Sequence, residues 1–178
     1  MRELRGLTGS DAQQLVVMGA SGAGKTTIAV RLAAYLEYAF ADGDDFQPAT
    51  NVAKMARAEP LTDADRGPWL ATLAEWIGNH HRLGRSTVLA CSALKRHYRD
   101  TLRGAAPTVF FIHLAVPSDV LAERMKHRVG HFMPPELLVS QLVTLEPLEP
   151  DEPGITIDAT APPATIVAKV VEHLAADA

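Results

Sequence analysis

Eight consecutive residues near the N-terminus have the types and the spacing of a phosphate-binding loop. They run from Gly19 to Thr26, read GASGAGKT, and match the pattern G-x-x-x-x-G-K-[ST] in full. Glycines let the backbone turn so tightly that successive N–H groups can point at phosphate oxygens. Lys25 would place a positive charge on the terminal phosphates, and the Thr26 hydroxyl could ligate Mg²⁺. The loop therefore predicts that the chain binds a nucleoside triphosphate together with its metal ion.

The sequence on either side of this loop has the context that the motif requires. Leu15–Met18 is a compact apolar run of the strand type, and Ile28, Leu32 and Leu36 form an apolar stripe at helical spacing. This helix would add its positive N-terminal end to the phosphate site. The chain has no Asn-Lys-x-Asp guanine-reading motif, which argues against a GTPase, and its 178 residues are few for a mechanical ATPase. These observations favour a small-molecule kinase.

A group of aspartates could supply the acid chemistry that phosphoryl transfer needs. The apolar run Thr87–Cys91 does not end in aspartate, whereas the weaker run Tyr38–Ala41 leads directly into Asp42-Gly43-Asp44-Asp45. Carboxylates at the carboxyl end of a strand beside the phosphate loop face the ligand site of an open α/β sheet. Asp42 could hold the hydration shell of Mg²⁺, and Asp44 could take the proton of an attacking hydroxyl. An exchange of these two roles, or a solvated acidic turn, is the alternative.

Five basic side chains gather in one segment of a chain whose net charge is −4: Arg124, Lys126, His127, Arg128 and His131. Arg124 and Arg128 would share a helix face if the helix that begins near Pro117 extends that far. A mobile segment that carries arginines suits a kinase lid, because it excludes water and neutralises charge on the transferred phosphoryl group. We expect a lid near residues 124–134, with Arg124 and Arg128 in catalytic roles. A solvated basic helix end is the alternative.

Polar and reactive side chains also follow the run Thr87–Cys91, at the same ligand-binding edge. For Lys95, Arg96 and Arg99, a substrate role and a plain helix surface are both open. Cys91 is interpreted as a small buried residue and not as a nucleophile, because the sequence places no base beside it.

Short apolar runs alternate with amphipathic stretches along the whole chain. Thr108–Leu114 and Ile155–Ile157 complete a set of five predicted strands, each expected to be buried on both faces. Further helical stripes run through residues 69–77 and 166–174. This alternation predicts an α/β protein with a three-layer P-loop NTPase fold of the nucleoside-kinase type. Its central sheet would be mostly parallel and flanked by helices.

The composition is that of an ordinary globular protein. Hydrophobic residues make up 47% and charged residues 21%. The mildly negative charge gives no attraction to nucleic acid, the single cysteine forms no intrachain disulfide, and no apolar run approaches the roughly 20 residues that span a membrane. The polar N-terminus lacks a signal-peptide core. We expect a cytoplasmic protein without nucleic-acid or membrane partners, with a flexible tail at residues 1–13 and a single kinase domain at residues 14–178.

Four blocks of sequence resemble the small P-loop gluconokinases, relatives of shikimate kinase. They are GASGAGKTT from Gly19, DGDDFQPATNVAKMARAEPLTDADRGPWL from Asp42, CSALKRHYRDTLR from Cys91 and GHFMPPELLVSQLVTLEPLEPDE from Gly130. The second and fourth blocks are far more specific than the first, and the resemblance extends from about Val16 to the C-terminus. It implies transfer of the γ-phosphate of ATP to the 6-hydroxyl of D-gluconate, which gives 6-phospho-D-gluconate. Family members are often homodimers, so it also implies a homodimer.

The resemblance implies roles for individual residues. Asp44 would contact the substrate, and Arg124 and Arg128 would belong to the lid. Together with Lys25, whose role the loop pattern predicts, these are the expected catalytic residues. Thr26, from the same pattern, and Asp42, from its place after a strand, would serve the metal. The nucleotide would be bound by Gly19, Ala20, Ser21, Gly22, Ala23, Gly24, Lys25, Thr26 and Thr27. Gluconate would be bound by Asp44, Arg66, Lys95, Arg96, His131 and Gln141. The chain departs from the family pattern at Gln47, where the family usually has His, and at Ala58, where it usually has Gly.

Two other functions are compatible with these residues. Arg66 and the basic residues at 95–99 would suit any small carboxylate, so a kinase for another hydroxy acid, such as shikimate, is one alternative. A nucleotide-dependent regulatory or binding protein is the other. It would need neither Asp44 nor a lid, and it would consume no ATP in response to an acceptor.

Overall fold

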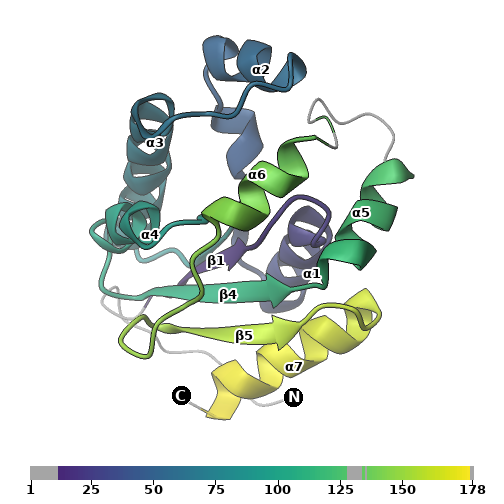
Figure 1. The fold of residues 1–178 in the computed structure, drawn as a ribbon. Helices are drawn as coiled ribbons and strands as arrows, with labels where there is room; N and C mark the ends of the chain where they lie inside the picture. The colour runs from purple at the N-terminus through teal and green to yellow at the C-terminus, as the bar shows by residue number, and fades with distance from the viewer. Residues whose placement is uncertain (1–11, 128–133, 135, 177–178) are drawn as a thin grey trace.

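The computed structural model describes residues 12–127, 134 and 136–176. In this part of the chain five strands form one parallel sheet in the order β2-β3-β1-β4-β5 (Figure 1). The strands are β1 (Gln14–Met18), β2 (Ala39–Asp42), β3 (Thr87–Ala90), β4 (Val109–Ala115) and β5 (Gly154–Asp158). All five overlap the apolar runs that predicted them, and the predicted α/β fold with a central parallel sheet is confirmed.

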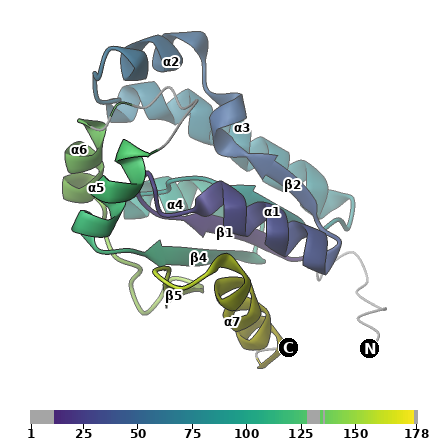
Figure 2. The same ribbon diagram turned by 90° about the vertical axis from the view of Figure 1, so that its right-hand side faces the viewer.

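Helices cover both faces of the sheet, which gives the three layers (Figures 1 and 2). One face packs against α1 and α7, the other packs against α3 and α4, and α2, α5 and α6 lie around the carboxyl ends of the strands. The helices are α1 (Lys25–Leu36), α2 (Ala49–Ala56), α3 (Asp63–Arg82), α4 (Arg96–Arg103), α5 (Ser118–Lys126), α6 (Leu137–Thr144) and α7 (Pro163–Ala176), with a short 3-10 helix η1 (Gly43–Phe46) after β2.

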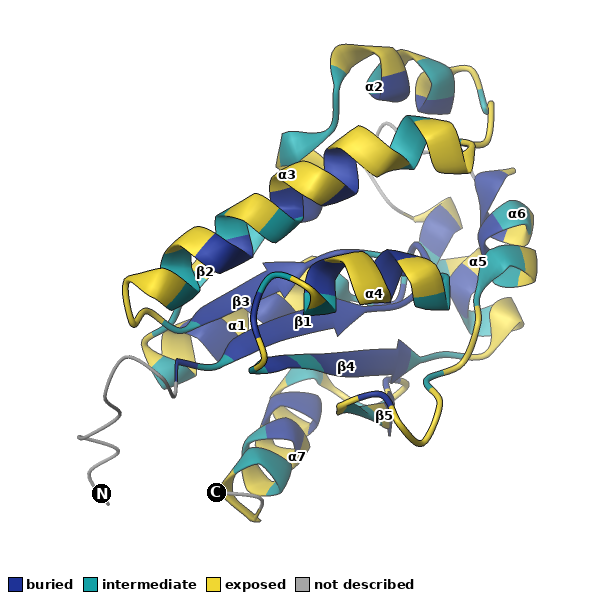
Figure 3. Ribbon diagram, turned by 90° about the vertical axis from the view of Figure 1, so that its left-hand side faces the viewer, coloured by how far each residue is buried: buried dark blue, intermediate teal, exposed yellow. Residues whose placement is uncertain are grey.

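The core consists of two apolar layers, because successive side chains of a strand point to opposite faces of the sheet. In β1, Leu15 and Val17 pack with α1 and α7, while Val16 and Met18 pack with α3 and α4. Figure 3 shows β1 and β3 as buried and β4 as mostly buried, whereas α3 exposes its outer side. This packing fixes β1, and with it the loop that follows, at the centre of the molecule.

The expectation that every strand is buried on both faces is wrong for the two outer strands. No residue of β2 is buried, and in β5 only Ile157 is. Both strands are edges of the sheet, so each has a single neighbouring strand, and the helical layers cover its side chains incompletely. The predicted burial holds for β1 and β3, and for most of β4.

The packed part of the chain begins before the predicted boundary at residue 14. Ala12 is buried and its carbonyl accepts a hydrogen bond from the Thr108 hydroxyl, while the Gln13 side chain accepts one from Tyr38. Residues 1–11 of the predicted tail lie outside the described residues. None of the described helices combines the length and the apolarity that crossing a bilayer would require.

Ala58, one of the two departures from the family pattern, lies just beyond the end of α2 in the left-handed region, with φ of 58°. A residue with a Cβ pays roughly 1–2 kcal/mol for this conformation, which is why glycine is common there. We therefore expect Ala58→Gly to raise the free energy of unfolding by about 1 kcal/mol, measured by denaturant titration. The matched control Ala71→Gly, on the exposed side of α3, should lower it by about 0.5–1 kcal/mol. A loss of stability in both variants would contradict the strain at Ala58.

Candidate active site

The carboxyl ends of β1, β2 and β3 open into a cavity of about 270 Å³. The chain leaves β1 towards β2 on one side of the sheet and later crosses from β3 to β4 on the other side, so the cavity lies where the winding direction changes. Open α/β sheets bind their ligands at such points. The cavity is lined by Ser21, Gly22, Gly24, Lys25, Thr26, Thr27, Asp42, Asp44, Gln47, Met55, Pro60, Leu61, Arg66, Ala90, Cys91, Ser92, Arg124, Leu137, Ser140 and Gln141.

The predicted phosphate loop joins β1 to α1 and forms one wall of this cavity. Gly19 has φ of 143°, and a Cβ there would lie 2.9 Å from the carbonyl oxygen of Leu114, so the loop can leave β1 only through glycine. Gly24 is the N-cap of α1 and has no side chain to cap the backbone N–H groups, and the first turn contains no acidic residue. Lys25 folds back over the loop, and its Nζ donates to the carbonyl of Ala20 at 3.1 Å. These donors suit an anionic ligand.

Asp42 lies beside the phosphate loop, as the sequence predicted. Its Oδ2 accepts a hydrogen bond of 2.6 Å from the Thr26 hydroxyl, and its Oδ1 accepts one of 3.0 Å from the backbone N–H of Asp44. Gly43 makes the turn possible, since a Cβ there would lie 2.7 Å from the carbonyl oxygen of Ala90. Trp69 of α3 holds the same turn by donating from its indole N–H to the carbonyl of Gly43 at 2.7 Å.

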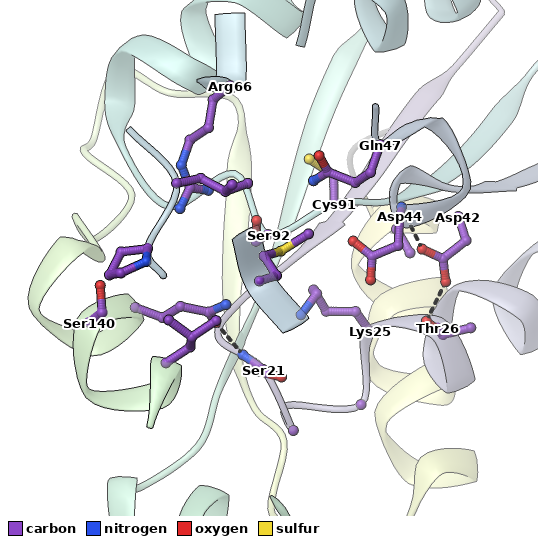
Figure 4. A pocket seen from close by; sticks show the side chains of 18 of the residues that line it. Ser21, Lys25, Thr26, Asp42, Asp44, Gln47, Arg66, Cys91, Ser92 and Ser140 are labelled. Carbon is purple, nitrogen blue, oxygen red and sulfur yellow. Dashed lines mark hydrogen bonds between the residues drawn. The ribbon is translucent and has the colours of Figure 1, made fainter. Parts of the chain in front are cut away.

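Asp44 extends into the cavity on the side where Lys25 enters it (Figure 4). Asp45 is not among the lining residues. Both aspartates line the cavity, and Asp42 makes the hydrogen bond to the candidate metal ligand Thr26, which fits the metal role predicted for Asp42.

Arg66 reaches the cavity from the first turns of α3 (Figure 4). Its guanidinium lies over the ring of Tyr98, 5.4 Å from the ring centre, and its Nε is buried without a hydrogen-bond partner among the described residues. A second polar group that lines the cavity is Gln47, which lies on the Asp44 side in Figure 4; its Oε1 accepts from the side-chain amide of Asn51 at 3.0 Å. Together a cation and an amide around the cavity suit a polar, anionic molecule.

Arg124 and Gln141 contact the phosphate loop from the opposite side. Arg124 of α5 donates to the carbonyl oxygens of Gly22, at 3.2 Å, and Ala159, at 3.0 Å. The Oε1 of Gln141, on α6, accepts a buried hydrogen bond of 2.7 Å from the backbone N–H of Ser21. Both residues line the cavity, and both also hold the loop in its position.

Two of the predicted substrate residues lie outside the set that lines the cavity. Lys95 pairs with Asp63 at 3.1 Å. Arg96 pairs with Glu149 and Asp151, both at 2.5 Å, and so attaches α4 to the segment before β5. These contacts give both side chains a place within the fold, and their predicted substrate role stays a prediction.

The predicted lid lies largely outside the described residues, and so do Arg128 and His131. Within the described part, α5 ends at Lys126, so the helix that Arg124 and Arg128 would share is not seen to continue. Lys126 and His127 both pair with the exposed Glu123.

For Arg99 the sequence left open a contact with the substrate or a place on a helix surface, and the structure shows a buried ion pair instead. Its side chain and that of Glu152 are completely buried and form a two-point ion pair, with distances of 2.6 and 2.8 Å. Its other N–H groups donate to four carbonyl oxygens, those of Ala93, Leu94, Glu146 and Pro147. Arg99 therefore joins the loop after β3, which lines the cavity, to the segment before β5.

Sequence reasoning missed several lining residues, among them Ser92 and Ser140, and treated Gln47 only as a departure from the family pattern. Ser92 follows β3 directly, so its place at the carboxyl end of a central strand was a usable signal. Cys91 is buried as predicted, and burial raises the pKa of its thiol to about 12, which keeps the thiol protonated and unreactive.

The chain matches a family model described as an AAA domain across residues 15–148. It is 46% identical over 163 residues to the gluconokinase of Gluconobacter oxydans (strain 621H), and the match covers 92% of each chain. The crystal structure of a sugar kinase from Janibacter sp. HTCC2649 is 50% identical with a TM-score of 0.88, covering 92% of this chain and 94% of that one. A gluconokinase structure from Sinorhizobium meliloti 1021 is 40% identical with a TM-score of 0.81, covering 94% and 98%. With a phosphate loop at the centre of a matching fold, the chain belongs to the gluconokinase family of ATP-using P-loop kinases.

Proposed function

We propose that this protein transfers the γ-phosphate of ATP to the 6-hydroxyl of D-gluconate. One observation carries the proposal: a single cavity presents the phosphate-loop lysine, Lys25, the carboxylate of Asp44 and the guanidinium of Arg66. These groups match the three needs of the reaction, which are a cation for the phosphates, a proton acceptor for the hydroxyl and a cation for the carboxylate of the sugar acid.

In this mechanism the 6-hydroxyl oxygen attacks the γ-phosphorus while the bond from that phosphorus to the β,γ-bridging oxygen breaks, and ADP leaves. The hydroxyl proton passes to the carboxylate of Asp44. Lys25 and the N–H groups at the start of α1 stabilise the charge that spreads over the phosphoryl oxygens. Arg124, and Arg128 in the proposed lid, would add positive charge and exclude water.

The residues beside the phosphate loop fit a bound Mg²⁺. Thr26 supplies a hydroxyl and Asp42 a carboxylate, with the two oxygens 2.6 Å apart. Mg²⁺ in kinases is usually held by one or two carboxylates, by waters and by substrate phosphates, so few protein ligands suffice. We propose that Thr26 and Asp42 hold the ion. When bound, it would neutralise negative charge on the nucleotide phosphates.

The acceptor would lie between Asp44 and Arg66, with its carboxylate at Arg66. Gln141 and, from the lid, His131 would complete its surroundings. Lys95 and Arg96 are weaker candidates for direct contact, since their pairing with acidic side chains already satisfies them. The family resemblance further suggests a homodimer, which size-exclusion chromatography with light scattering would test.

The product identifies the reaction. Proton-coupled ³¹P NMR of the mixture after incubation with ATP, Mg²⁺ and gluconate should show a phosphate ester split into a triplet, because the 6-carbon carries two protons. A doublet would place the phosphate on a secondary hydroxyl and contradict the proposed site of transfer.

Replacing Asp44 with asparagine should lower turnover about 10²-fold, because asparagine keeps the shape but cannot accept the proton. ATP affinity, measured separately by titration, should change little. Asp45→Asn is the matched control, since Asp45 is the next residue and does not line the cavity. If Asp44→Asn instead weakens ATP binding strongly while turnover at saturating ATP stays normal, Asp44 serves the metal, and the roles of Asp42 and Asp44 are exchanged.

A further inference from the structure

Five polar side chains meet where the start of α3 contacts α4, next to the Arg66 wall of the cavity: those of Asp63, Arg66, Lys95, His97 and Tyr98. Tyr98 is 3% exposed, and its hydroxyl donates to Oδ1 of Asp63. Lys95 donates to the same carboxylate, and its Nζ lies 5.6 Å from the centre of the Tyr98 ring. Arg66 lies over that ring at 5.4 Å. The ring is thus in contact range of two cations, and one carboxylate holds both the ring and one of the cations.

Not every cation in this cluster has a partner of opposite charge among the described residues. Asp63 is kept ionised, because hydrogen bonds from Tyr98 and Lys95 lower its pKa, and burial raises the pKa of Tyr98, so the phenol remains a donor. Lys95 therefore has a counter-charge. Among the described residues Arg66 has no carboxylate partner, and its buried Nε–H has no acceptor.

An N–H group that is buried without an acceptor destabilises a protein, unless a ligand supplies the acceptor. The aromatic ring attracts the guanidinium but cannot satisfy the Nε–H in this way. It does restrict the orientations that the long arginine side chain can take, and a guanidinium fixed before binding loses less freedom when it binds. The ring thus prepares Arg66 to receive an oxyanion from the cavity.

We propose that Tyr98, held by Asp63, is a positioning residue that fixes Arg66 for the carboxylate of the acceptor, and that it thereby makes the site select sugar acids over uncharged polyols. This inference rests on the proposed function. Among the described residues the side chain of Tyr98 contacts Asp63, Arg66, Lys95 and His97 and none of the phosphate loop, so its effect should be confined to the acid end of the acceptor. Neither Tyr98 nor Asp63 lines the cavity, and both act through Arg66.

The test compares Tyr98→Met, which fills space without a ring, with Tyr98→Phe, which keeps the ring. Loss of the cation–π contact should raise the KM for gluconate roughly 2- to 30-fold in Tyr98→Met, with the KM for ATP unchanged. Tyr98→Phe should raise the gluconate KM by a smaller factor. With D-glucitol, which has the same carbon chain but no carboxylate, kcat/KM should be the same in both variants as in the wild type.

A double-mutant cycle separates positioning from a structural role. In an Arg66→Ala background, neither Tyr98 substitution should change the gluconate KM further, because the residue through which Tyr98 acts is gone. The control Leu102→Ala removes a fully buried side chain from the same helix and should leave both KM values unchanged while it lowers stability. If Tyr98→Met does not fold, the gluconate KM of Tyr98→Phe is compared between the wild-type and Arg66→Ala backgrounds instead.

Equal losses for gluconate and D-glucitol, a raised KM for ATP, or an undiminished effect in the Arg66→Ala background would each overturn the inference. Failure of the proposed function looks different. A wild-type enzyme that phosphorylates another small acid but not gluconate would refute gluconate as the substrate, and the same cycle would then be measured with that acid. A wild-type enzyme that phosphorylates no acid overturns both.

Discussion

Replacing Lys25 with alanine should lower turnover by about 10²–10³, with the fold intact. The ammonium group lies over the phosphate loop at the start of α1, where the charge of the transferred phosphoryl group would develop. Removal of one such preorganised electrostatic contact typically costs about 2.7–4 kcal/mol of transition-state stabilisation. The measurement is steady-state ATP consumption with saturating gluconate and Mg²⁺, accompanied by a thermal unfolding scan.

The matched control for this prediction is Lys169→Ala. Lys169 is an exposed lysine of α7, on the far side of the sheet from α2 and α3 in Figure 1. Its removal changes the net charge by the same amount and should leave turnover unchanged. Turnover close to that of the wild type in a folded Lys25→Ala protein would contradict the assignment of the loop to catalysis.

The second large effect is expected on stability, at the buried pair of Arg99 and Glu152. Arg99→Met would leave the Glu152 carboxylate buried without a counter-charge, and four carbonyl oxygens would lose a donor. Breaking one side of a buried pair typically lowers the free energy of unfolding by about 3–5 kcal/mol. Denaturant titration should show this loss. Arg103→Met, which breaks an exposed pair with Asp100 on the same helix, should cost less than about 1 kcal/mol.

The same pair predicts a dependence on pH with a definite sign. Burial alone would raise the pKa of Glu152, but the hydrogen bonds from Arg99 and the backbone outweigh it, and the pKa is lowered. A lowered pKa in the folded state contributes stability above the unfolded pKa of about 4.3, and this is lost as the pH falls through the folded value. In Arg99→Met only the backbone hydrogen bond from Glu149 and the charge of Arg96 still oppose the effect of burial, so the pKa of Glu152 should rise. The stability gap between wild type and variant should therefore narrow from pH 7 towards pH 4, and a gap that stays constant would contradict the ion-pair account.

Local sequence patterns were sufficient for the features that depend on neighbours in the chain. The loop at Gly19–Thr26 is fixed by its own glycines and by the strand and helix beside it, so it was predicted completely. The same holds for Asp42, which reaches Thr26 because Asp42 ends β2, Thr26 follows β1, and the carboxyl ends of the two strands lie at one edge of the sheet. Burial of β2 and β5 was predicted wrongly, since strand order decides which strands are edges, and composition does not reveal that order.

Contacts between distant segments could not be read from the sequence. Arg99 pairs with Glu152 across 53 residues, and Tyr98 meets Asp63 across 35. Both contacts depend on how α4 packs against α3 and against the segment before β5. The spacing of apolar residues along the chain carries no information about that packing. For this reason the basic residues at 95–99 looked alike in the sequence. In the fold, Lys95 pairs with Asp63, Arg96 ties two segments together at the surface, and Arg99 is buried.

ATP consumption across a panel of acceptors tests the central claim most directly. The purified protein is incubated with ATP and Mg²⁺ and with gluconate, another aldonate, shikimate or no acceptor, and ADP formation is followed. We expect rapid ADP formation with gluconate, slow formation with shikimate, and only background without an acceptor. ADP formation that is independent of acceptor, or faster with shikimate than with gluconate, would contradict the proposal that this member of the gluconokinase family phosphorylates gluconate.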